Sequence, residues 1–149
     1  MAMPQPRIRE LTDVQQTSSE MYRIAWAWKE DMAPWASMNL QELFDLIKNI
    51  PFNADPEGVE FLQRPWYTMN QTGRGGDCDD RAIATGAWCH LRGIPFRFVA
   101  VSRSKTAPLH HVLTELYLNG EWFEFDPTYS FNVLGRPLSV YPQRLILRP

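Results

Sequence analysis

Three side chains that are far apart in the sequence have the chemistry of nucleophilic acyl transfer: Cys78, His111 and Asp126. A cysteine thiolate attacks carbonyl carbon atoms. An imidazole can take the thiol proton and return it to the leaving group, while a carboxylate holds the imidazole in orientation. We therefore predict that Cys78 is the nucleophile, His111 the base and acid, and Asp126 the residue that orients the histidine.

The residues around Cys78 predict a sharp turn that leads into a helix. Gly75 and Gly76 precede Asp77, a residue type that caps helix N-termini, and the helical pattern then continues to Gly93. Cys78 thus falls in the first turn, where free N–H groups and the positive end of the helix dipole favour a thiolate and can bind an oxyanion. The two glycines leave room above the cysteine for a substrate carbonyl.

Asp77, Asp79 and Asp80 surround Cys78 with negative charge, which raises the pKa of a thiol unless the carboxylates cap the helix or pair with arginine. The same carboxylates could suggest a calcium loop, but the glycine and distal glutamate of such a loop are missing. Zinc bound by Cys78, His111 and a carboxylate is an alternative on ligand type, although no second cysteine or histidine completes a tetrahedral site. We expect no cofactor.

The register of a predicted hairpin decides which histidine meets Asp126. The Asn-Gly dipeptide at 119–120 forms a two-residue turn, which places Leu113 opposite Asp126. Because side chains alternate along a strand, His111 shares a face with Leu113 and Asp126, whereas His110 points to the other face. His111 and Asp126 are then diagonal neighbours about 7 to 8 Å apart, close enough for their side chains to form a hydrogen bond.

Helical periodicity fills the first part of the chain and strand periodicity the second part. We predict helices over 18–31, over 39–50 with a capping box of Asn39 and Glu42, and a third short helix from Asp55, and then a loop over 65–76. Strands are predicted over 96–101, 112–118 and 122–126, and residues 145–147 form an edge strand or an arm. The fold class is α+β, with the nucleophile-bearing helix packed on an antiparallel sheet.

Four segments in this order resemble the transglutaminase-like superfamily: Gly-Asp-Cys-Asp-Asp at 76–80, Gly-Ile-Pro-Phe-Arg at 93–97, His-Val-Leu-Thr-Glu at 111–115, and Trp122 with Asp-Pro-Thr at 126–128. The resemblance covers residues 65–129, preceded by a helical segment at 18–64 and followed by an arm at 130–149. It implies a papain-like core whose Cys, His, Asp triad falls on Cys78, His111 and Asp126, in agreement with the hairpin argument.

The resemblance leaves the upstream oxyanion donor open. Gln71, Asn70 and Trp66 are all candidates for this role, and Gly76 is a candidate for substrate binding. The sequence departs from the family at Leu113, where the family often has an aromatic residue.

Composition excludes several other classes of protein. The 149 residues, 44% of them hydrophobic, predict a single folded domain over 1–149. A net charge of -2, with scattered lysine and arginine, argues against a nucleic-acid or anionic-membrane binder. No stretch has the character of a signal peptide or a membrane-spanning helix, so we expect a cytoplasmic or virion-associated protein. Cys89 lies mid-helix and has the role of a small buried apolar residue.

The predicted reaction is cysteine-dependent acyl transfer on an amide or ester through a thioester, with a protein or peptide as substrate. Resolution by water, as in a peptidase or amidase, is slightly preferred over transamidation to an amine. The short form with Gly-Asp-Cys-Asp-Asp also resembles modules of bacteria and tailed bacteriophages. The alternative function is therefore a structural or interaction module of a larger assembly such as a phage particle.

Overall fold

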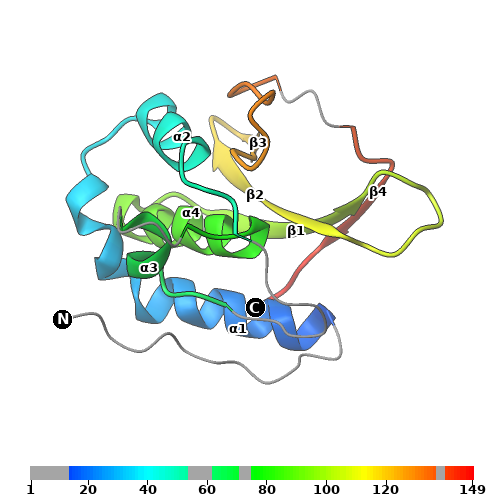
Figure 1. Ribbon diagram of the computed structural model, residues 1–149, viewed down its shortest axis with the longest axis horizontal. Coiled ribbons are helices and arrows are strands. Elements are labelled where there is room, and N and C mark those ends of the chain that lie inside the picture. The colour runs from blue at the N-terminus through cyan, green and yellow to red at the C-terminus, as the bar shows by residue number, and fades with distance from the viewer. Residues whose placement is uncertain (1–13, 54–61, 71–74, 137–139) are drawn as a thin grey trace.

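The computed structural model describes residues 14–53, 62–70, 75–136 and 140–149 (Figure 1). The helices and strands follow one another in the order α1 (Val14–Ala27), η1 (Lys29–Trp35), α2 (Leu40–Lys48), α3 (Pro65–Met69), α4 (Cys78–Arg92), β1 (Phe96–Ser102), β2 (His111–Leu118), β3 (Glu121–Phe125) and β4 (Gln143–Ile146). The strands form an antiparallel sheet in the order β3-β2-β1-β4. This arrangement confirms the predicted α+β class.

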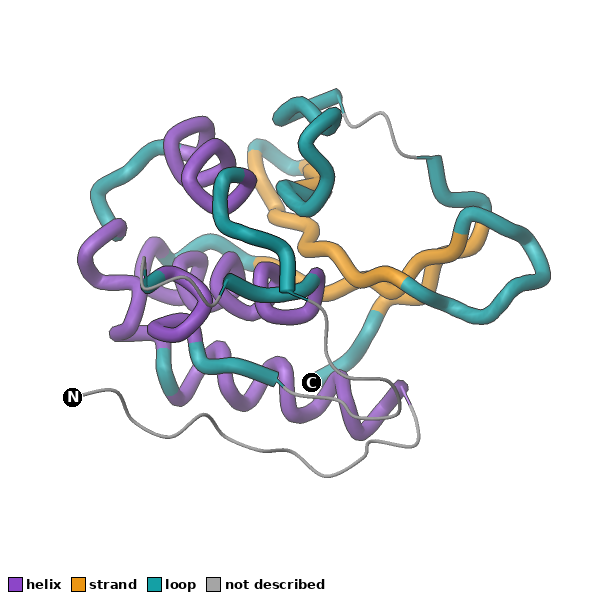
Figure 2. The backbone as a smooth tube through the Cα atoms, viewed as in Figure 1, coloured by secondary structure: helices purple, strands orange, loops and turns teal. Residues whose placement is uncertain are grey.

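Helix α4 lies between α1 and the sheet (Figure 2) and contacts both β1 and β2. It begins as predicted, because the Asp77 carboxylate accepts a hydrogen bond from the Asp80 N–H and the Asp80 carboxylate accepts one from the Asp77 N–H, each at 3.2 Å. It ends as predicted at Gly93, whose φ of 66° is the left-handed conformation of a helix C-cap. Midway along, Gly86 permits close contact with β1, since a Cβ there would lie 2.7 Å from the Phe96 ring.

Three apolar clusters hold the layers together. One surrounds Trp88 and joins α2, η1, α4, β2 and β3, and a second surrounds Ile83 and joins α1, α4 and β1. The third is small and lies on the other face of the sheet, where it consists of Val99, Val101, Leu113 and Tyr141. Burial on both faces explains why apolar residues predominate on both faces of β1 and β2.

The predicted hairpin of β2 and β3 is confirmed. Asn119 and Gly120 both have positive φ, 52° and 83°, as the expected two-residue turn requires. Leu118 pairs with Glu121, and the pairing continues to Thr114 with Phe125. The last strand, β4, pairs with β1 at the edge of the sheet, which settles the open choice for the C-terminal residues in favour of an edge strand.

The N-terminal helices differ in part from the prediction. The helix predicted over 18–31 begins earlier and ends at Ala27, and the chain then continues as the 3-10 helix η1, which contains Pro34. The capping box of α2 is confirmed, with both Asn39–Glu42 hydrogen bonds at 2.9 Å. The helix predicted from Asp55 falls outside the described residues.

The loop predicted over 65–76 is wrong at its start, where α3 forms. The Asp31 carboxylate accepts a hydrogen bond from the Trp66 N–H at 3.0 Å and pairs with Arg64 at 2.7 Å. A side chain from η1 therefore satisfies a free N–H at the start of α3, a contact that local sequence cannot reveal.

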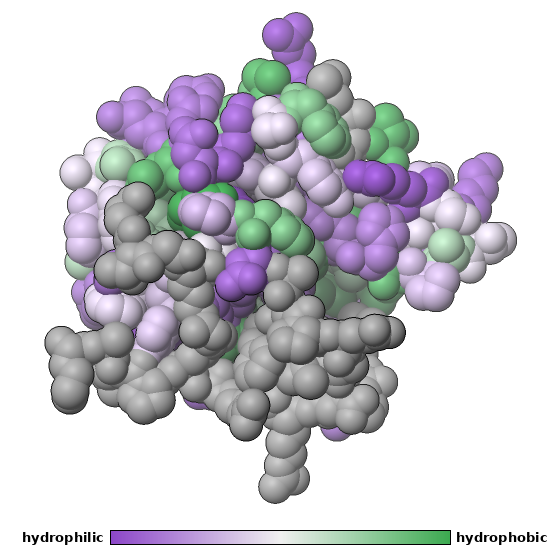
Figure 3. Space-filling view, viewed as in Figure 1, coloured by the Kyte–Doolittle hydropathy of each residue, from purple (hydrophilic) through white to green (hydrophobic). Residues whose placement is uncertain are grey.

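On the face shown in Figure 3, hydrophobic side chains form small groups between hydrophilic ones. Over the described ranges, no helix combines the length and the apolar character needed to cross a bilayer.

Candidate active site

Cys78 is the first residue of α4 and its side chain is half-buried. The sulfur lies 3.9 Å from Asp79 Oδ1 and accepts a hydrogen bond from the backbone of Val112. Burial raises the pKa of the thiol well above its ordinary value, the charges of Asp79 and Asp77 raise it further, and the Val112 N–H opposes them. The acidic neighbours thus act as the sequence indicates, and the surroundings of Cys78 favour the thiol over the thiolate.

His111 and Asp126 form the hydrogen bond that the hairpin register predicts. His111 Nε2 lies 2.9 Å from Asp126 Oδ2, and the two side chains are only 2% and 1% exposed. Because an ionised carboxylate only accepts hydrogen bonds, the proton belongs on Nε2, and Nδ1 of the neutral ring is left as an acceptor. A backbone donor also fixes the carboxylate, since the Thr128 N–H donates to Asp126 Oδ1 at 3.3 Å.

Cys78 and Asp126 line the same tightly packed cleft between α4 and the hairpin, together with Val112 and Leu113. The backbone group that contacts the sulfur belongs to Val112, the residue that follows His111 in β2. Within the described residues, no hydrogen bond joins the Cys78 thiol to the imidazole. The part of the predicted triad that is joined by a hydrogen bond is therefore the His111–Asp126 pair.

Aromatic rings enclose the imidazole. The centroid of the His111 ring lies 5.1 Å from that of Tyr129 and 5.7 Å from that of Tyr141. Phe131 stacks on Tyr129 at 5.2 Å with the two rings nearly parallel. Such rings exclude water from the His111–Asp126 hydrogen bond, which strengthens it electrostatically.

The structure describes Gly76 and Trp66, two of the residues predicted for oxyanion and substrate binding. The Gly76 N–H donates to Pro51 O at 3.1 Å, so it is not free to bind an oxyanion. Gly76 is needed for space instead, because a Cβ there would lie 2.7 Å from Asp80 Cβ. The Trp66 N–H donates to Asp31, and Trp66 is not among the residues that line the Cys78 cleft. Gln71 lies outside the described residues.

The sequence profile of the Transglutaminase-like superfamily matches residues 29–127, a span that contains Cys78, His111 and Asp126. The chain belongs to this superfamily. Membership supports a cysteine-dependent enzyme as the general class of activity. The match also begins well before residues 65–129, to which the four short motifs point, and includes η1 and α2. Among curated proteins, the search found no match.

Solved structures that resemble this chain share little sequence with it. Calcium-bound LapG from Legionella pneumophila is 17% identical with a TM-score of 0.51, over 76% of this chain and 74% of LapG. A protein from Cytophaga hutchinsonii described as a candidate cysteine protease is 18% identical with a TM-score of 0.42, over 90% of this chain and 44% of that one. The periplasmic domain of TgpA from Pseudomonas aeruginosa is 20% identical with a TM-score of 0.46, over 75% and 44%. The chain therefore spans less than half the length of the last two proteins, and the likeness to LapG shows the fold alone.

Two buried charged side chains, Asp80 and Arg81, hold the start of the helix that carries Cys78. Asp80 is 1% exposed and accepts hydrogen bonds from both the backbone and the side-chain N–H groups of Gln63, each at 2.9 Å. Arg81 is also 1% exposed and donates to the carbonyls of Ile47 at 2.6 Å and Ile50 at 2.7 Å. These bonds tie the first turn of α4 to the segments around it. They became visible only with the tertiary structure.

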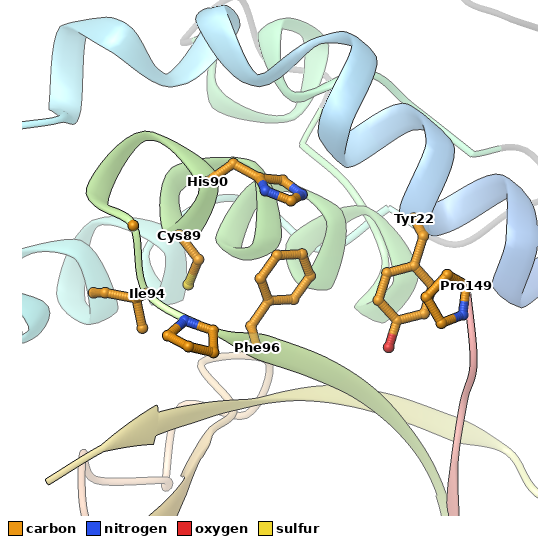
Figure 4. A pocket seen from close by; sticks show the side chains of 8 residues that line it. Tyr22, Cys89, His90, Ile94, Phe96 and Pro149 are labelled. Atoms are coloured by element: carbon orange, nitrogen blue, oxygen red, sulfur yellow. The ribbon is translucent and has the colours of Figure 1, made fainter.

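A larger cavity, of about 410 Å³, lies at the opposite end of α4 and includes Cys89 and His90 in its lining (Figure 4). Burial raises the pKa of the Cys89 thiol strongly, so this cysteine stays protonated. Burial and the charge of Lys29 lower the pKa of His90. Burial thus disfavours a thiolate at Cys89, and the absence of a chemical role for this residue stays a prediction. In the part of the chain that the structure describes, no group of three or more His, Cys, Asp or Glu residues could hold a metal ion.

Proposed function

We propose that this protein catalyses cysteine-dependent acyl transfer on amide or ester substrates, with Cys78, His111 and Asp126 as the catalytic residues. The observation that carries the proposal is the buried hydrogen bond between His111 Nε2 and Asp126 Oδ2 beside the Cys78 cleft. An imidazole fixed in this way presents Nδ1 as its free acceptor, which is the atom that a base requires.

The proposed reaction begins when a bound substrate draws the Cys78 thiol to Nδ1 of His111. The proton moves from sulfur to Nδ1, and the thiolate attacks the substrate carbonyl. The N–H of Cys78 is the first of α4 and has no partner within the helix, so it can donate to the oxyanion. Collapse of the tetrahedral intermediate breaks the bond to the leaving amine or alcohol, which takes the proton from His111 and leaves a thioester.

We propose that water resolves the thioester. Water gives up a proton to His111 as it attacks, and the product is a carboxylic acid together with the free thiol. Resolution by an amine would be transamidation, and an amine acceptor needs a binding site of its own next to the cysteine. Water needs no such site, and this is the reason why we propose hydrolysis. We propose a protein or peptide as the acyl donor, as expected from the sequence.

The alternative is a structural or interaction module of a larger assembly, such as a phage particle, in which the triad is idle. The observation in favour of this alternative is the setting of Cys78, whose burial and acidic neighbours Asp79 and Asp77 disfavour a thiolate. The two functions differ in whether Cys78 becomes acylated. In an enzyme, Cys78 accepts the acyl group of a substrate with the help of His111, whereas in an assembly module it does not.

The test is acylation by an activated ester such as p-nitrophenyl acetate, with peptide mass spectrometry to locate the adduct. We expect a hydroxylamine-sensitive thioester on Cys78 and none in Cys78→Ala. The acylation rate should fall by roughly 100-fold or more in His111→Ala, since general base catalysis contributes at least that factor. His110→Ala and Cys89→Ser are the matched controls and should acylate normally. The mechanism would be refuted if His111→Ala were acylated as fast as the unchanged protein, or if Cys89 were labelled as fast as Cys78. The assembly module would then be the preferred function.

A further inference from the structure

The Asp126 carboxylate receives a hydrogen bond that the proposed triad does not include. Asn132 Nδ2 lies 3.4 Å from Asp126 Oδ2, the same oxygen that accepts from His111 Nε2. The same amide nitrogen donates to the backbone carbonyl of Asp126 at 3.1 Å. One amide group therefore holds both the side chain and the backbone of Asp126.

Asn132 is itself held in place. Its side chain is completely buried, and its backbone N–H donates to Tyr129 O at 3.0 Å. Its backbone carbonyl accepts a hydrogen bond from Lys48 Nζ of α2 at 3.3 Å. The turn that Asn132 closes also carries Tyr129, whose ring packs on His111. A buried amide with this many contacts has one orientation available to it.

We propose that Asn132 is a positioning residue that sets the orientation of Asp126 and, through it, of the His111 imidazole. This inference rests on the proposed function. Two donors on one oxygen and a third on the other prevent the carboxylate from rotating about its bond to Cβ. A carboxylate that cannot rotate keeps the proton on Nε2 and leaves Nδ1 as the acceptor.

The matched profile of the superfamily ends at residue 127, so Asn132 lies beyond it. The active site of this protein therefore extends into the segment that follows β3, which supplies both the amide donor and the ring over His111.

The test compares Asn132→Ala and Asn132→Asp with the unchanged protein. Both variants lack the N–H donor, and Asn132→Asp keeps the shape of the side chain. We expect kcat to fall by about 10-fold or more, the range typical of such supporting partners, with KM nearly unchanged because substrate contacts are retained. In Asn132→Ala, 15N NMR of the histidines should show a smaller fraction of the Nε2-protonated tautomer of His111.

Two control variants separate orientation from simple support of the turn. Ser130 is exposed in the same turn, and Ser130→Ala should leave kcat and the tautomer unchanged. Lys48→Met removes the bond to the Asn132 carbonyl but keeps the amide donor, so the tautomer should persist even where stability falls.

An unchanged His111 tautomer in a folded Asn132→Ala protein, or a loss of kcat equal to that of Lys48→Met, would overturn the proposal. If Asn132→Ala does not fold, Asn132→Asp provides the test: a lower kcat with nearly unchanged KM supports the proposal, and an unchanged kcat overturns it. The NMR measurement needs no turnover, so it gives a result on Asn132 even if the acyl-transfer proposal fails.

Discussion

At the scale of the residue, Asp80 places a carboxylate in the interior beside the nucleophile. Burial raises its pKa from 3.8 to about 6, although the N–H groups of Gln63 and Asp77 that donate to it act in the opposite direction. Between about pH 4 and pH 6 the folded protein therefore binds more protons at this group than the unfolded chain does. The free energy of unfolding should fall as the pH rises through this window, by up to ~1.4 kcal/mol per pH unit from Asp80.

The measurement is a series of urea unfolding curves from pH 4 to pH 7 for the protein and for Asp80→Asn, which cannot titrate. We expect the decrease in stability with rising pH to be smaller in Asp80→Asn. Asp45→Asn, which removes an exposed carboxylate of α2, should keep the full decrease. If Asp80→Asn and Asp45→Asn show the same pH dependence, the carboxylate of Asp80 does not titrate in this range.

At the scale of the element, α2 and α4 begin with the same device, a capping box, but only the box of α4 adjoins a reactive group. Asp77→Ala should cost about 1 kcal/mol of stability, the usual effect of losing an N-cap. It should also lower the pKa of the Cys78 thiol, because the Asp77 charge raises it. Alkylation of Cys78 by iodoacetamide near neutral pH should therefore become faster.

Asn39→Ala is the matched control, since it removes the cap of α2 and should cost a similar amount of stability. It should leave the alkylation rate of Cys78 unchanged, because Asn39 is uncharged and caps a different helix. Faster alkylation in both variants would mean that loss of a cap opens the structure, and that the Asp77 charge is not the cause.

The elements that could be predicted from the sequence are those whose ends depend on local chemistry. The Asn-Gly dipeptide at 119–120 favours the positive φ angles of a two-residue turn through its own local chemistry. The register that brings His111 to Asp126 could therefore be predicted. Helix α3 could not be predicted in this way, because the carboxylate that accepts from its Trp66 N–H belongs to Asp31, more than thirty residues earlier.

The same distinction applies to the candidate site. Trp66 and Gly76 remain predicted candidates for oxyanion and substrate binding. The partners of their backbone N–H groups, Asp31 and Pro51, come from other segments and could not be predicted. Asn132 could not be found, because its contact with Asp126 depends on the path of the chain after Pro127, which no local pattern determines.

At the scale of the whole molecule, Tyr22 of α1 links the first helix to the last strand. Its hydroxyl donates to Leu147 O at 2.9 Å and accepts a hydrogen bond from the Phe98 N–H at 2.8 Å. The Leu147 N–H in turn donates to Phe98 O at 2.8 Å, so β1, the residues after β4 and α1 meet at one point. The ring of Tyr22 packs on that of Phe98 with centroids 4.5 Å apart.

Tyr22→Phe keeps the ring and removes only the hydroxyl, which leaves the Phe98 N–H and the Leu147 carbonyl without this partner. We expect the free energy of unfolding to fall by about 1 to 3 kcal/mol, the cost of an unsatisfied buried polar group. Urea unfolding followed by tryptophan fluorescence measures the loss. Tyr117→Phe is the control, because Tyr117 is 42% exposed and surface changes usually stay within about 0.5 kcal/mol. Equal stabilities of the two variants would show that the Tyr22 hydroxyl does not hold α1 to the sheet, and that the apolar contacts of its ring suffice.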